Sequence, residues 1–519
     1  MELCSFYSGA AVCPELISAR AALNKQPAMA LFLALLFLAL SGSSSPIAAR
    51  ASDHGDDYMI VAMSSLKLKS AACLGHRVTP PLNSTWMPLD LMDGPCSSPS
   101  SSSAVVPSVD ELLRRDQLRA DEVQKRLSHN VGDDEANGPA NSKVTQVNHL
   151  AKIKVELGSR KPAKTTASQL GIHPAATVGG GAGSGTLLPG VIQTVVLDTA
   201  SDVPWVQCVP CPVPPCHPQT DTFYDPTNSG SYAAFTCSSS ACRQLGPYAN
   251  GCANSQCQYR VTYPDGSSTS GTYSSDLLTL NPTTMVNNFQ FGCSHADQGN
   301  FDSQTAGVMA LGGGPESLIS QTASTFGRTF SYCLPPTASY VGFFVLGAPG
   351  VASSSSRYVV TPLLRDNRSP ATFYRVLLRA VTVAGRRIAV PPAAASAGAV
   401  LDSRTVITRL PPTAYAAVRA AFRDSMRMYP AAAPKGSLDT CYDFRGIRSV
   451  ILPRVTLVFD RDAAAVELDP SGILFNDCLA FAANRDDRMP VILGNVQQQT
   501  IEVLYDVDGG AVGFRRNAC

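Results

Sequence analysis

Two aspartates stand in similar surroundings, one in each half of the chain. Asp198 opens the run 198–201 (Asp-Thr-Ala-Ser) and Asp402 opens the run 402–405 (Asp-Ser-Arg-Thr), and each follows a short apolar stretch. Hydroxyl side chains one and three positions after a carboxyl group can donate hydrogen bonds to its oxygens when the group is buried. Two such carboxyl groups brought face to face hold one proton between them, so one is a base and the other an acid. The spacing therefore predicts a paired-carboxylate site.

Further motifs follow these aspartates in a fixed order. They are DTASDVPWVQC at 198–208, YPDGS around Tyr263, AVLDSRTVITRLPP at 399–412, ILG at 492–494, and a dense group of cysteines between 208 and 257. In this combination the chain resembles the pepsin-type aspartic proteases, in their plant nepenthesin-like branch. The resemblance covers about residues 176 to 519. It implies an all-β, bilobal fold of two β-barrels with short helices and a central cleft.

The resemblance also implies a role for each motif residue. Asp198 and Asp402 would share a proton and activate a water that attacks a peptide carbonyl, without a covalent intermediate. Ser201 and Thr405 would hydrogen-bond the outer carboxylate oxygens, and Thr199 and Ser403 would hold the two loops together. Tyr263 would form a flap over the substrate with Trp205 as its hydrogen-bond partner. The implied substrate is a polypeptide, and no cofactor or metal is implied.

Four positions depart from the family pattern. Ala200, Arg404 and Ala310 stand where the family has glycine, and Pro264 replaces the glycine after the flap tyrosine. A guanidinium stays charged at any relevant pH, so Arg404 would stabilise two ionised carboxylates and eject the shared proton if it reached them. If Arg404 points outward, the pair keeps its proton. Both orientations stay open, and with them two functions: an acid-pH endopeptidase, or an impaired binding protein like the plant xylanase inhibitors.

Short strand-like runs separated by Gly, Pro, Asn and Ser fill the region after Val191, which favours an all-β body. The clearest helix begins at 411–412 and places Tyr415, Val418, Phe422 and Met426 on one face. Only the stretch 184–193 separates a Gly-rich linker from the first Asp strand, so a family strand is expected to be missing there. The predicted segments are 1–49, an N-terminal extension and signal peptide; 50–175, a propeptide-like region; 176–360, an N-terminal lobe; and 361–519, a C-terminal lobe.

A charged helix is predicted near 108–127, within the propeptide-like region. Ser108 and Glu111 form a capping box, and apolar residues recur at helical spacing among many charges. A solvated linker helix fits this pattern. Its place ahead of a protease-like region favours a propeptide whose Arg and Lys residues cover an acidic cleft until low pH releases them.

Composition and cysteines indicate a secreted protein. The net charge is +1 and 16% of residues are charged, which gives no basic patch for nucleic acid. An apolar run at 28–40 precedes small residues ending at Ala49, the layout of a secretory signal, and it is too short to span a membrane. The interpretation is a monomeric, secreted plant glycoprotein, extracellular or vacuolar, made as a zymogen and with a glycosylation sequon at Asn83.

Disulfides are the predicted state of the cysteines in an oxidising compartment. A zinc site at Cys208 and Cys211 with His217 is the weaker alternative, because no second ligand pair with regular spacing follows. By resemblance, Cys441 pairs with Cys478 and Cys333 with Cys519, and Cys73 and Cys96 form a candidate pair in the propeptide. The twelve candidates after residue 200 are Cys208, Cys211, Cys216, Cys237, Cys242, Cys252, Cys257, Cys293, Cys333, Cys441, Cys478 and Cys519.

Overall fold

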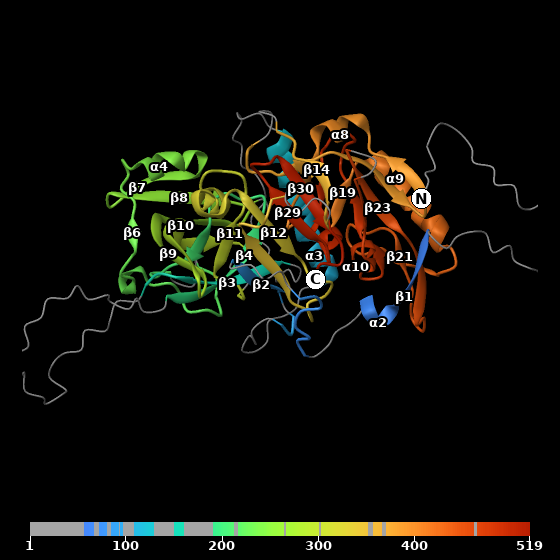
Figure 1. Cartoon of the computed structure of the whole chain (residues 1–519), viewed down its shortest axis with the longest axis horizontal. Helices are drawn as coiled ribbons and strands as arrows, with labels where there is room; N and C mark the ends of the chain where they lie inside the picture. The colour runs from blue at the N-terminus through green and yellow to red at the C-terminus, as the bar shows by residue number, and fades with distance from the viewer. Residues whose placement is uncertain are drawn as a thin grey trace, which may run out of the picture. The chain divides into compact units, whose positions relative to one another are not determined.

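The computed structural model describes residues 57–66, 72–79, 85–92, 94–96, 108–128, 150–159, 190–211, 216–263, 266–299, 301, 303–350, 357–365, 370–460 and 464–519. The predicted signal peptide, the Asn83 sequon position and Pro264 lie outside these residues. The described residues from 57 onward fall in one compact unit (Figure 1).

Strands dominate the part of the chain that is described, as the turn-rich spacing predicted. One sheet contains fifteen strands in the order β14-β30-β29-β12-β13-β2-β3-β4-β11-β5-β10-β9-β8-β7, with β6 paired to β9. Their bounds are β2 Trp86–Leu91, β3 Ala151–Leu157, β4 Val191–Asp198, β5 Trp205–Gln207, β6 Ala233–Ala234, β7 Ala249–Ala253, β8 Gln256–Thr262, β9 Ser268–Asn281, β10 Thr284–Gln298, β11 Gly307–Ala310, β12 Thr329–Cys333, β13 Gly342–Leu346, β14 Val359–Pro362, β29 Glu502–Asp506 and β30 Ala511–Arg515.

The second half of the chain builds smaller sheets in the orders β15-β18-β28-β19-β27, β17-β16-β23-β24 and β20-β21-β26-β25, while β1 pairs with β22. The bounds are β1 Tyr58–Ala62, β15 Arg375–Val376, β16 Leu378–Val383, β17 Arg386–Ala389, β18 Ala399–Leu401, β19 Thr408–Leu410, β20 Ala431–Ala432, β21 Cys441–Tyr442, β22 Ser449–Pro453, β23 Val455–Phe459, β24 Ala465–Glu467, β25 Leu474–Phe475, β26 Cys478–Leu479, β27 Phe481–Ala483 and β28 Val491–Leu493.

Helices are few and mostly short among the described residues. They are α2 Met63–Leu66, α3 Val109–Ser128, α4 Ser240–Gln244, α5 Leu318–Gln321, α6 Ala323–Phe326, α8 Pro392–Ala397, α9 Pro412–Met426, α10 Pro470–Ile473 and α11 Asn495–Gln498, with 3-10 turns η1 Pro226–Asn228 and η2 Gly246–Tyr248. The prediction for α9 is confirmed, because it begins at Pro412 and buries Tyr415, Val418, Phe422 and Met426. The fold is the all-β pepsin-like architecture expected from the motifs.

The two aspartates sit at equivalent points of a repeated strand arrangement. β4 ends at Asp198 and runs parallel to β11, with Leu197 opposite Met309. In the second half β18 ends just before Asp402 and runs parallel to β28, with Leu401 opposite Leu493. Buried apolar side chains in these strands hold both loops from below. The predicted internal repeat is therefore present around the two Asp loops.

The strand expected to be missing before β4 is present, and that expectation is wrong. β3 pairs antiparallel with β4 from Lys152–Val196 to Leu157–Val191, and β2 pairs with both β3 and β13. The strand arises from residues that the predicted organisation placed in the 50–175 region. Sequence inspection missed it because the 32 residues between positions 158 and 191 separate the partners.

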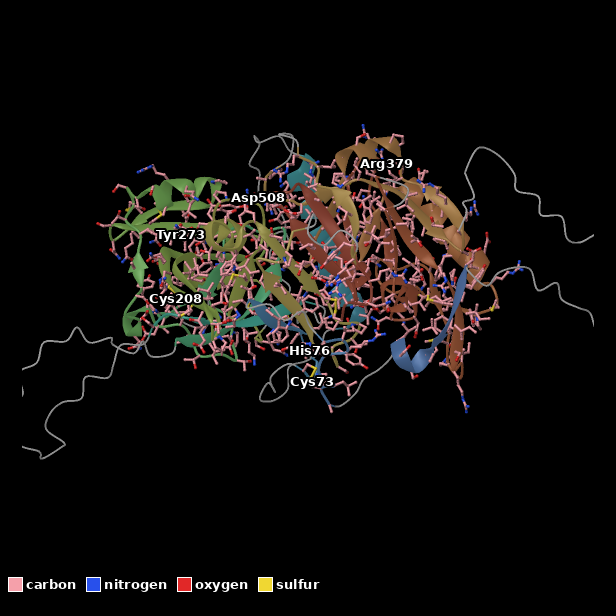
Figure 2. The ribbon with its side chains drawn as sticks, viewed as in Figure 1. Cys73, His76, Cys208, Tyr273, Arg379 and Asp508 are labelled. Carbon is pink, nitrogen blue, oxygen red and sulfur yellow. A yellow bond between two sulfur atoms is a disulfide. The ribbon has the colours of Figure 1, made fainter. Side chains whose placement is uncertain are left out.

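Seven disulfides link the described cysteines: Cys73–Cys96, Cys208–Cys293, Cys211–Cys216, Cys237–Cys252, Cys242–Cys257, Cys333–Cys519 and Cys441–Cys478. The three pairings inferred beforehand are confirmed, including the one at Cys73 (Figure 2). Cys208 and Cys211 are both bonded to other cysteines, so the zinc alternative at these thiols is wrong. Within the described ranges, no group of three or more His, Cys, Asp and Glu side chains is arranged to hold a metal ion.

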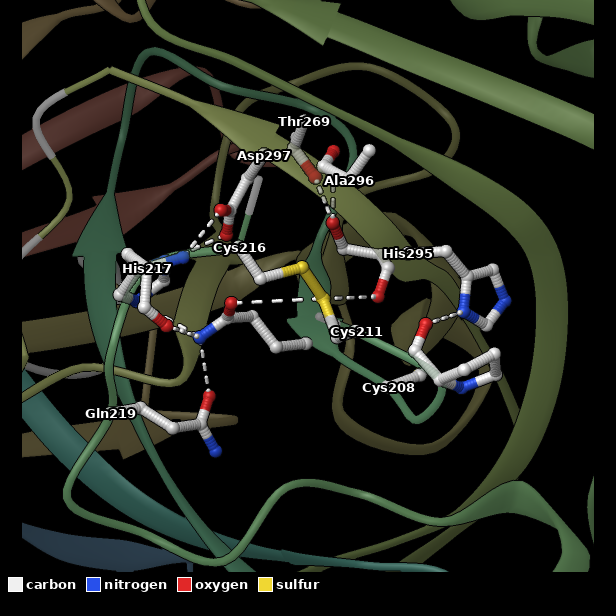
Figure 3. Close-up of a disulfide and its surroundings, with 12 residues drawn as sticks. Cys208, Cys211, Cys216, His217, Gln219, Thr269, His295, Ala296 and Asp297 are labelled. Atoms are coloured by element: carbon white, nitrogen blue, oxygen red, sulfur yellow. Dashed lines mark hydrogen bonds and ion pairs between the residues drawn. A yellow bond between two sulfur atoms is a disulfide. The ribbon is translucent and has the colours of Figure 1, made fainter. Parts of the chain in front are cut away.

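His217 beside the Cys211–Cys216 disulfide has a structural set of partners instead. Its Nδ1 lies 2.6 Å from Asp297 Oδ2 (Figure 3). Its Nε2 lies 2.9 Å from the Thr305 carbonyl oxygen, and the Gln207 amide donates to the His217 carbonyl oxygen. The ring also packs near Trp205 and Phe301. His217 thus supports the strand that carries Trp205.

Candidate active site

The two Asp loops are joined by a reciprocal set of hydrogen bonds. Thr199 N–H donates to Ser403 Oγ at 3.1 Å, and Ser403 N–H donates to Thr199 Oγ1 at 3.0 Å. Each hydroxyl also donates to the strand end of the opposite half, Thr199 to the Leu401 carbonyl at 3.0 Å and Ser403 to the Leu197 carbonyl at 2.9 Å. All four residues are buried. This symmetric link holds Asp198 and Asp402 next to each other.

The carboxylates accept hydrogen bonds from their own loops. Ala200 N–H lies 2.9 Å from Asp198 Oδ1, Arg404 N–H lies 3.0 Å from Asp402 Oδ1, and Thr405 Oγ1 donates to Asp402 Oδ2 at 2.7 Å. The bond expected from Ser201 to Asp198 is not formed. The oxygens of Asp198 are instead occupied by Ala200 N–H and two arginines.

The first of these arginines comes from helix α3. Arg119 Nη2 lies 2.8 Å from Asp198 Oδ1 and 3.2 Å from Asp402 Oδ1, and its Nε lies 3.0 Å from Asp402 Oδ2. The Asp side chains are fully buried and Arg119 is 11% exposed. A planar guanidinium can bridge two carboxylates in this way. Arg119 therefore forms ion pairs with both members of the pair at once.

This contact changes the protonation of Asp402. Burial alone raises the pKa of a carboxyl group, but the charge and hydrogen bonds of Arg119, with Thr405 Oγ1 and Arg404 N–H, hold the Asp402 pKa below its ordinary value. The charged form of Asp402 is thus favoured while Arg119 is bound.

Helix α3 lies between strands of the first half and strands of the second half of the chain (Figure 1), and it contacts residues of both. Its residues Ala120 and Val123 share an apolar cluster with Ala200, and Leu112 and Leu113 share another with residues of the second half. Arg126 Nη1 donates to the Ala200 carbonyl at 3.0 Å. The predicted charged helix is confirmed, and Glu111 N–H is capped by Ser108 Oγ at 3.2 Å. It covers the site along its length.

Arg404 points inward, which resolves the two orientations left open by the sequence. Its Nη1 lies 3.0 Å from Asp198 Oδ2, and its guanidinium lies 5.3 Å from the centre of the Tyr263 ring. Its side chain is 19% exposed. Asp198 therefore faces two guanidinium groups, one from α3 and one from the second Asp loop.

Tyr263 and Trp205 are placed as the motifs predicted. Trp205 Nε1 donates to Tyr263 Oη at 2.7 Å, and the Phe301 ring packs edge-on against both aromatic rings. Burial, against the charge of Arg404, raises the Tyr263 pKa to about 12. The phenol stays neutral and closes the first-half side of the site.

The glycine departures are accommodated in different ways. Ala200 is fully buried and its methyl group packs in the cluster with α3, while Ala310 lies opposite Asp198 in the β11–β4 pairing. Gly494, at the equivalent place in the second half, has no such space. A Cβ there would meet the Val406 carbonyl oxygen at 2.6 Å and the Ile407 carbonyl carbon at 2.8 Å.

Gly494→Ala is expected to lower the free energy of unfolding by about 1–3 kcal/mol, because the added methyl group meets backbone atoms that hold the second Asp loop. Chemical denaturation with the disulfides intact measures the change, and Gly494→Val should cost more than alanine. An unchanged denaturation midpoint in both variants would show that the second Asp loop shifts to make room for the side chain without loss of stability.

Sequence reasoning missed Arg119, Asp116 and Arg409 as site residues. Asp116 of α3 accepts from Arg409 and from two backbone amides next to the second Asp loop. The signal was present only as a helix with many charges. Nothing in the spacing distinguishes Arg119 from the other arginines of α3.

Comparison with known proteins identifies the family of this chain. The xylanase inhibitor N-terminal family model matches residues 186–348 and the xylanase inhibitor C-terminal model matches residues 373–516. An aspartyl protease family protein of Arabidopsis thaliana is 36% identical over 475 residues, which cover 89% of this chain and 93% of that protein. Aspartic proteinase nepenthesin-2 of Nepenthes gracilis is 31% identical over 344 residues, 63% of this chain and 74% of its own length.

A solved structure supports the fold. The crystal structure of basic 7S globulin from soybean superposes with a TM-score of 0.53 and 20% identity, and it covers 71% of this chain and 91% of the globulin. No described helix is both long and apolar enough to cross a membrane. Motifs, paired Asp loops and relatives agree, and the chain belongs to the pepsin-like aspartic proteases of plants, in the branch of the nepenthesins and the xylanase-inhibitor family models.

Proposed function

We propose that this chain is the precursor of a secreted aspartic endopeptidase that α3 keeps inactive. The observation that carries the proposal is the bridge from Arg119 to both Asp198 and Asp402. A linker helix without a role in the site would not need to bury an arginine between two carboxylates, because burying charges costs free energy unless they are paired.

Once α3 leaves, Asp198 and Asp402 would share one proton and hold a water between them. The ionised member takes a proton from the water as it attacks the peptide carbonyl, and the protonated member donates to the carbonyl oxygen. Tyr263, held by Trp205, would close over the polypeptide. The proposed protein acts as a monomer in the secretory pathway or outside the cell, and it needs no cofactor.

β3 lies between β2 and β4 in the large sheet and follows α3 in the chain, so a cut after α3 can keep β3 in the processed protein, whereas β2 precedes the cut and either stays bound to β3 and β13 or leaves with α3. Removal of residues through 175 would take this strand out of the sheet and expose the backbone groups of its neighbours. We therefore expect the activating cut between Ser128 and Leu150. The N-terminus of the processed protein, determined by mass spectrometry, should precede Ala151.

Arg404 favours a second candidate function. Its guanidinium lies 3.0 Å from Asp198, and because Arg404 belongs to the second Asp loop it is not removed with α3. A pair that keeps this cation binds anions better than it activates water. On this alternative the chain is a binding or inhibitor protein on the protease fold.

The deciding experiment is an assay of the purified, acid-processed protein on denatured globin at about pH 3–5, the range in which an acid pair can hold one proton. Cleavage that pepstatin blocks, and that Asp402→Asn abolishes without changing the folded state by circular dichroism, supports the endopeptidase. Processed, folded protein that does not cleave at any pH in this range would support the binding protein instead.

A further inference from the structure

Beneath α3 lies a group of hydrogen-bond donors that converges on the Asp116 carboxylate. Val406 N–H lies 2.5 Å from Asp116 Oδ1, and Ile407 N–H lies 3.2 Å from Asp116 Oδ2. Arg409 Nη2 lies 2.7 Å from the same Oδ2. Asp116 and Arg409 are both fully buried. Two backbone amides and a guanidinium thus form a site of the size of one carboxylate.

All three donors belong to the body of the protein, while the acceptor belongs to the segment proposed to leave. Val406 and Ile407 follow the second Asp loop directly, and Arg409 is in the middle of β19. Besides Asp116, Arg409 contacts a neutral group, because its Nη1 donates to Ser437 Oγ at 3.2 Å. Its Nε has no hydrogen-bond partner among the described residues. Asp116 is its ion-pair partner there.

Departure of α3 therefore leaves a cation without its anion. A guanidinium is charged at any relevant pH, so once α3 leaves, Arg409 has no anionic partner of its own in the described part of the chain and keeps the neutral Ser437 hydroxyl. The amides of Val406 and Ile407 lose their acceptor at the same time. A carboxylate supplied by another molecule would satisfy all three donors.

The Asp116 site is close enough to the aspartate pair to bind a substrate side chain next to the cleaved bond. Asp116 and Arg119 are three residues apart on one helix face, which corresponds to a rise of about 4.5 Å. An extended peptide advances about 3.3 Å per residue. If Arg119 marks the reacting centre, a side chain in the Asp116 position belongs to a residue one or two places from the scissile bond.

We propose that Arg409, with the amides of Val406 and Ile407, is a specificity subsite that recognises the side-chain carboxylate of an Asp or Glu residue within two positions of the cleaved bond. The inference rests on the proposed function, and it adds a substrate class to it. Asp116 occupies the subsite in the precursor as an internal substitute for that acidic residue.

The test compares peptides that differ in one group. Processed protein is assayed with C-terminally amidated peptides carrying Glu or Gln at each of the two positions on either side of the cleaved bond, at a pH above the ordinary Glu pKa of about 4.3. At one position kcat/KM should be about tenfold or more higher for Glu, as expected for a charge-assisted hydrogen bond. Equal rates for Glu and Gln at all four positions would overturn the proposal.

A variant pair identifies the residue responsible. Arg409→Gln is combined with Asp116→Asn, so that the precursor buries two neutral amides and no unpaired charge. In the double variant the ratio of kcat/KM for the Glu peptide to kcat/KM for the Gln peptide should fall to about one. Arg485→Gln is the control, because Arg485 pairs with Asp121 of α3 at 2.5 Å but is 70% exposed, and it should keep the preference. Retained preference in the folded double variant would overturn the assignment.

A binding measurement separates this inference from the proposed function. Non-cleavable reduced-bond versions of the Glu and Gln peptides are titrated into the processed protein by calorimetry. Tighter binding of the Glu peptide, lost in the double variant, supports the subsite even if no peptide is cleaved, in which case only the endopeptidase proposal fails. Equal affinities of the two peptides would overturn the subsite whatever the activity.

Discussion

The Arg119→Gln precursor is expected to bind its own helix α3 roughly 100-fold more weakly than the parent. Removing one partner of a buried ion pair costs about 3–5 kcal/mol, and the lower end applies because Arg404 still faces Asp198. Each 1.4 kcal/mol corresponds to a factor of ten. Hydrogen exchange of the α3 amides at neutral pH measures the change directly, since exchange reports local opening.

Arg114→Gln provides the matched control on the same helix. Arg114 pairs with Glu111 within α3, its side chain is 47% exposed, and an exposed pair of this kind contributes little. Exchange of the α3 amides should stay near the parent rate in this variant. If Arg119→Gln also left the exchange rate unchanged, the bridge to the two aspartates would not be what holds the helix.

The same variant should change how α3 responds to acid. The Asp402 pKa is lowered with Arg119 bound, so this contact stabilises docking above the ordinary Asp pKa of about 3.9 and is lost as pH falls through the lowered value. Asp116 contributes a pH dependence of the opposite sign. Its burial raises its pKa, although Arg409 and two backbone amides act against this, so its contribution to docking grows as pH falls. Without Arg119 the weakening of α3 docking at acid pH should disappear, since the remaining contribution has the opposite sign.

Much of the fold follows from patterns that are local in the sequence. The strand that ends at Asp198 and the helix that begins at Pro412 combine correct periodicity with clear turn or proline boundaries. β3 could not be found in this way, because its partners β2 and β4 lie far along the chain on either side. Strand pairing of this kind is decided by tertiary contacts, and local propensity does not report it.

The site was predictable as a set of residue types but not as a set of contacts. The hydroxyl residues Thr199, Ser403 and Thr405 make the bonds expected of them, whereas Ser201 does not. Which arginine of α3 reaches the aspartates depends on how the helix is rotated against both halves of the chain. The rotation is set by packing of Leu112, Leu113, Ala120 and Val123, which no spacing rule provides.

The direction of Arg404 was open for a related reason. Its side chain has two favourable partners, the Asp198 carboxylate and the face of the Tyr263 ring. Cation–ring contact and ion pairing act together there. Tyr263 is in turn held by Trp205 from β5. Inward placement thus depends on a residue about 140 positions earlier in the chain, which the loop sequence alone does not reveal.

Removing the charge of Arg404 is expected to increase peptidase activity of the processed protein by about 10- to 1,000-fold at pH 5. An arginine beside a carboxyl group favours its charged form by about 1–3 pKa units. Arg404 Nη1 lies 3.0 Å from Asp198 Oδ2, and we expect its charge to oppose a shared proton on the pair and so to limit cleavage at pH 5. Arg404→Met removes the cation and keeps most of the side-chain volume against Tyr263. Arg404→Gly removes both.

The pH–rate profile distinguishes charge from packing. In Arg404→Met the pH at which activity falls off on the less acidic side of the profile should rise by about 1–3 pH units. In Arg404→Lys, which keeps a charge, that pH should change little. A gain in the glycine variant alone would assign the effect to space near Tyr263. Arg445→Gly, at an exposed pair with Asp443, should match the parent. If neither the methionine nor the glycine variant gains activity or shifts its limb, then Arg404 does not limit peptide cleavage by the processed protein, because its charge would have been removed without effect.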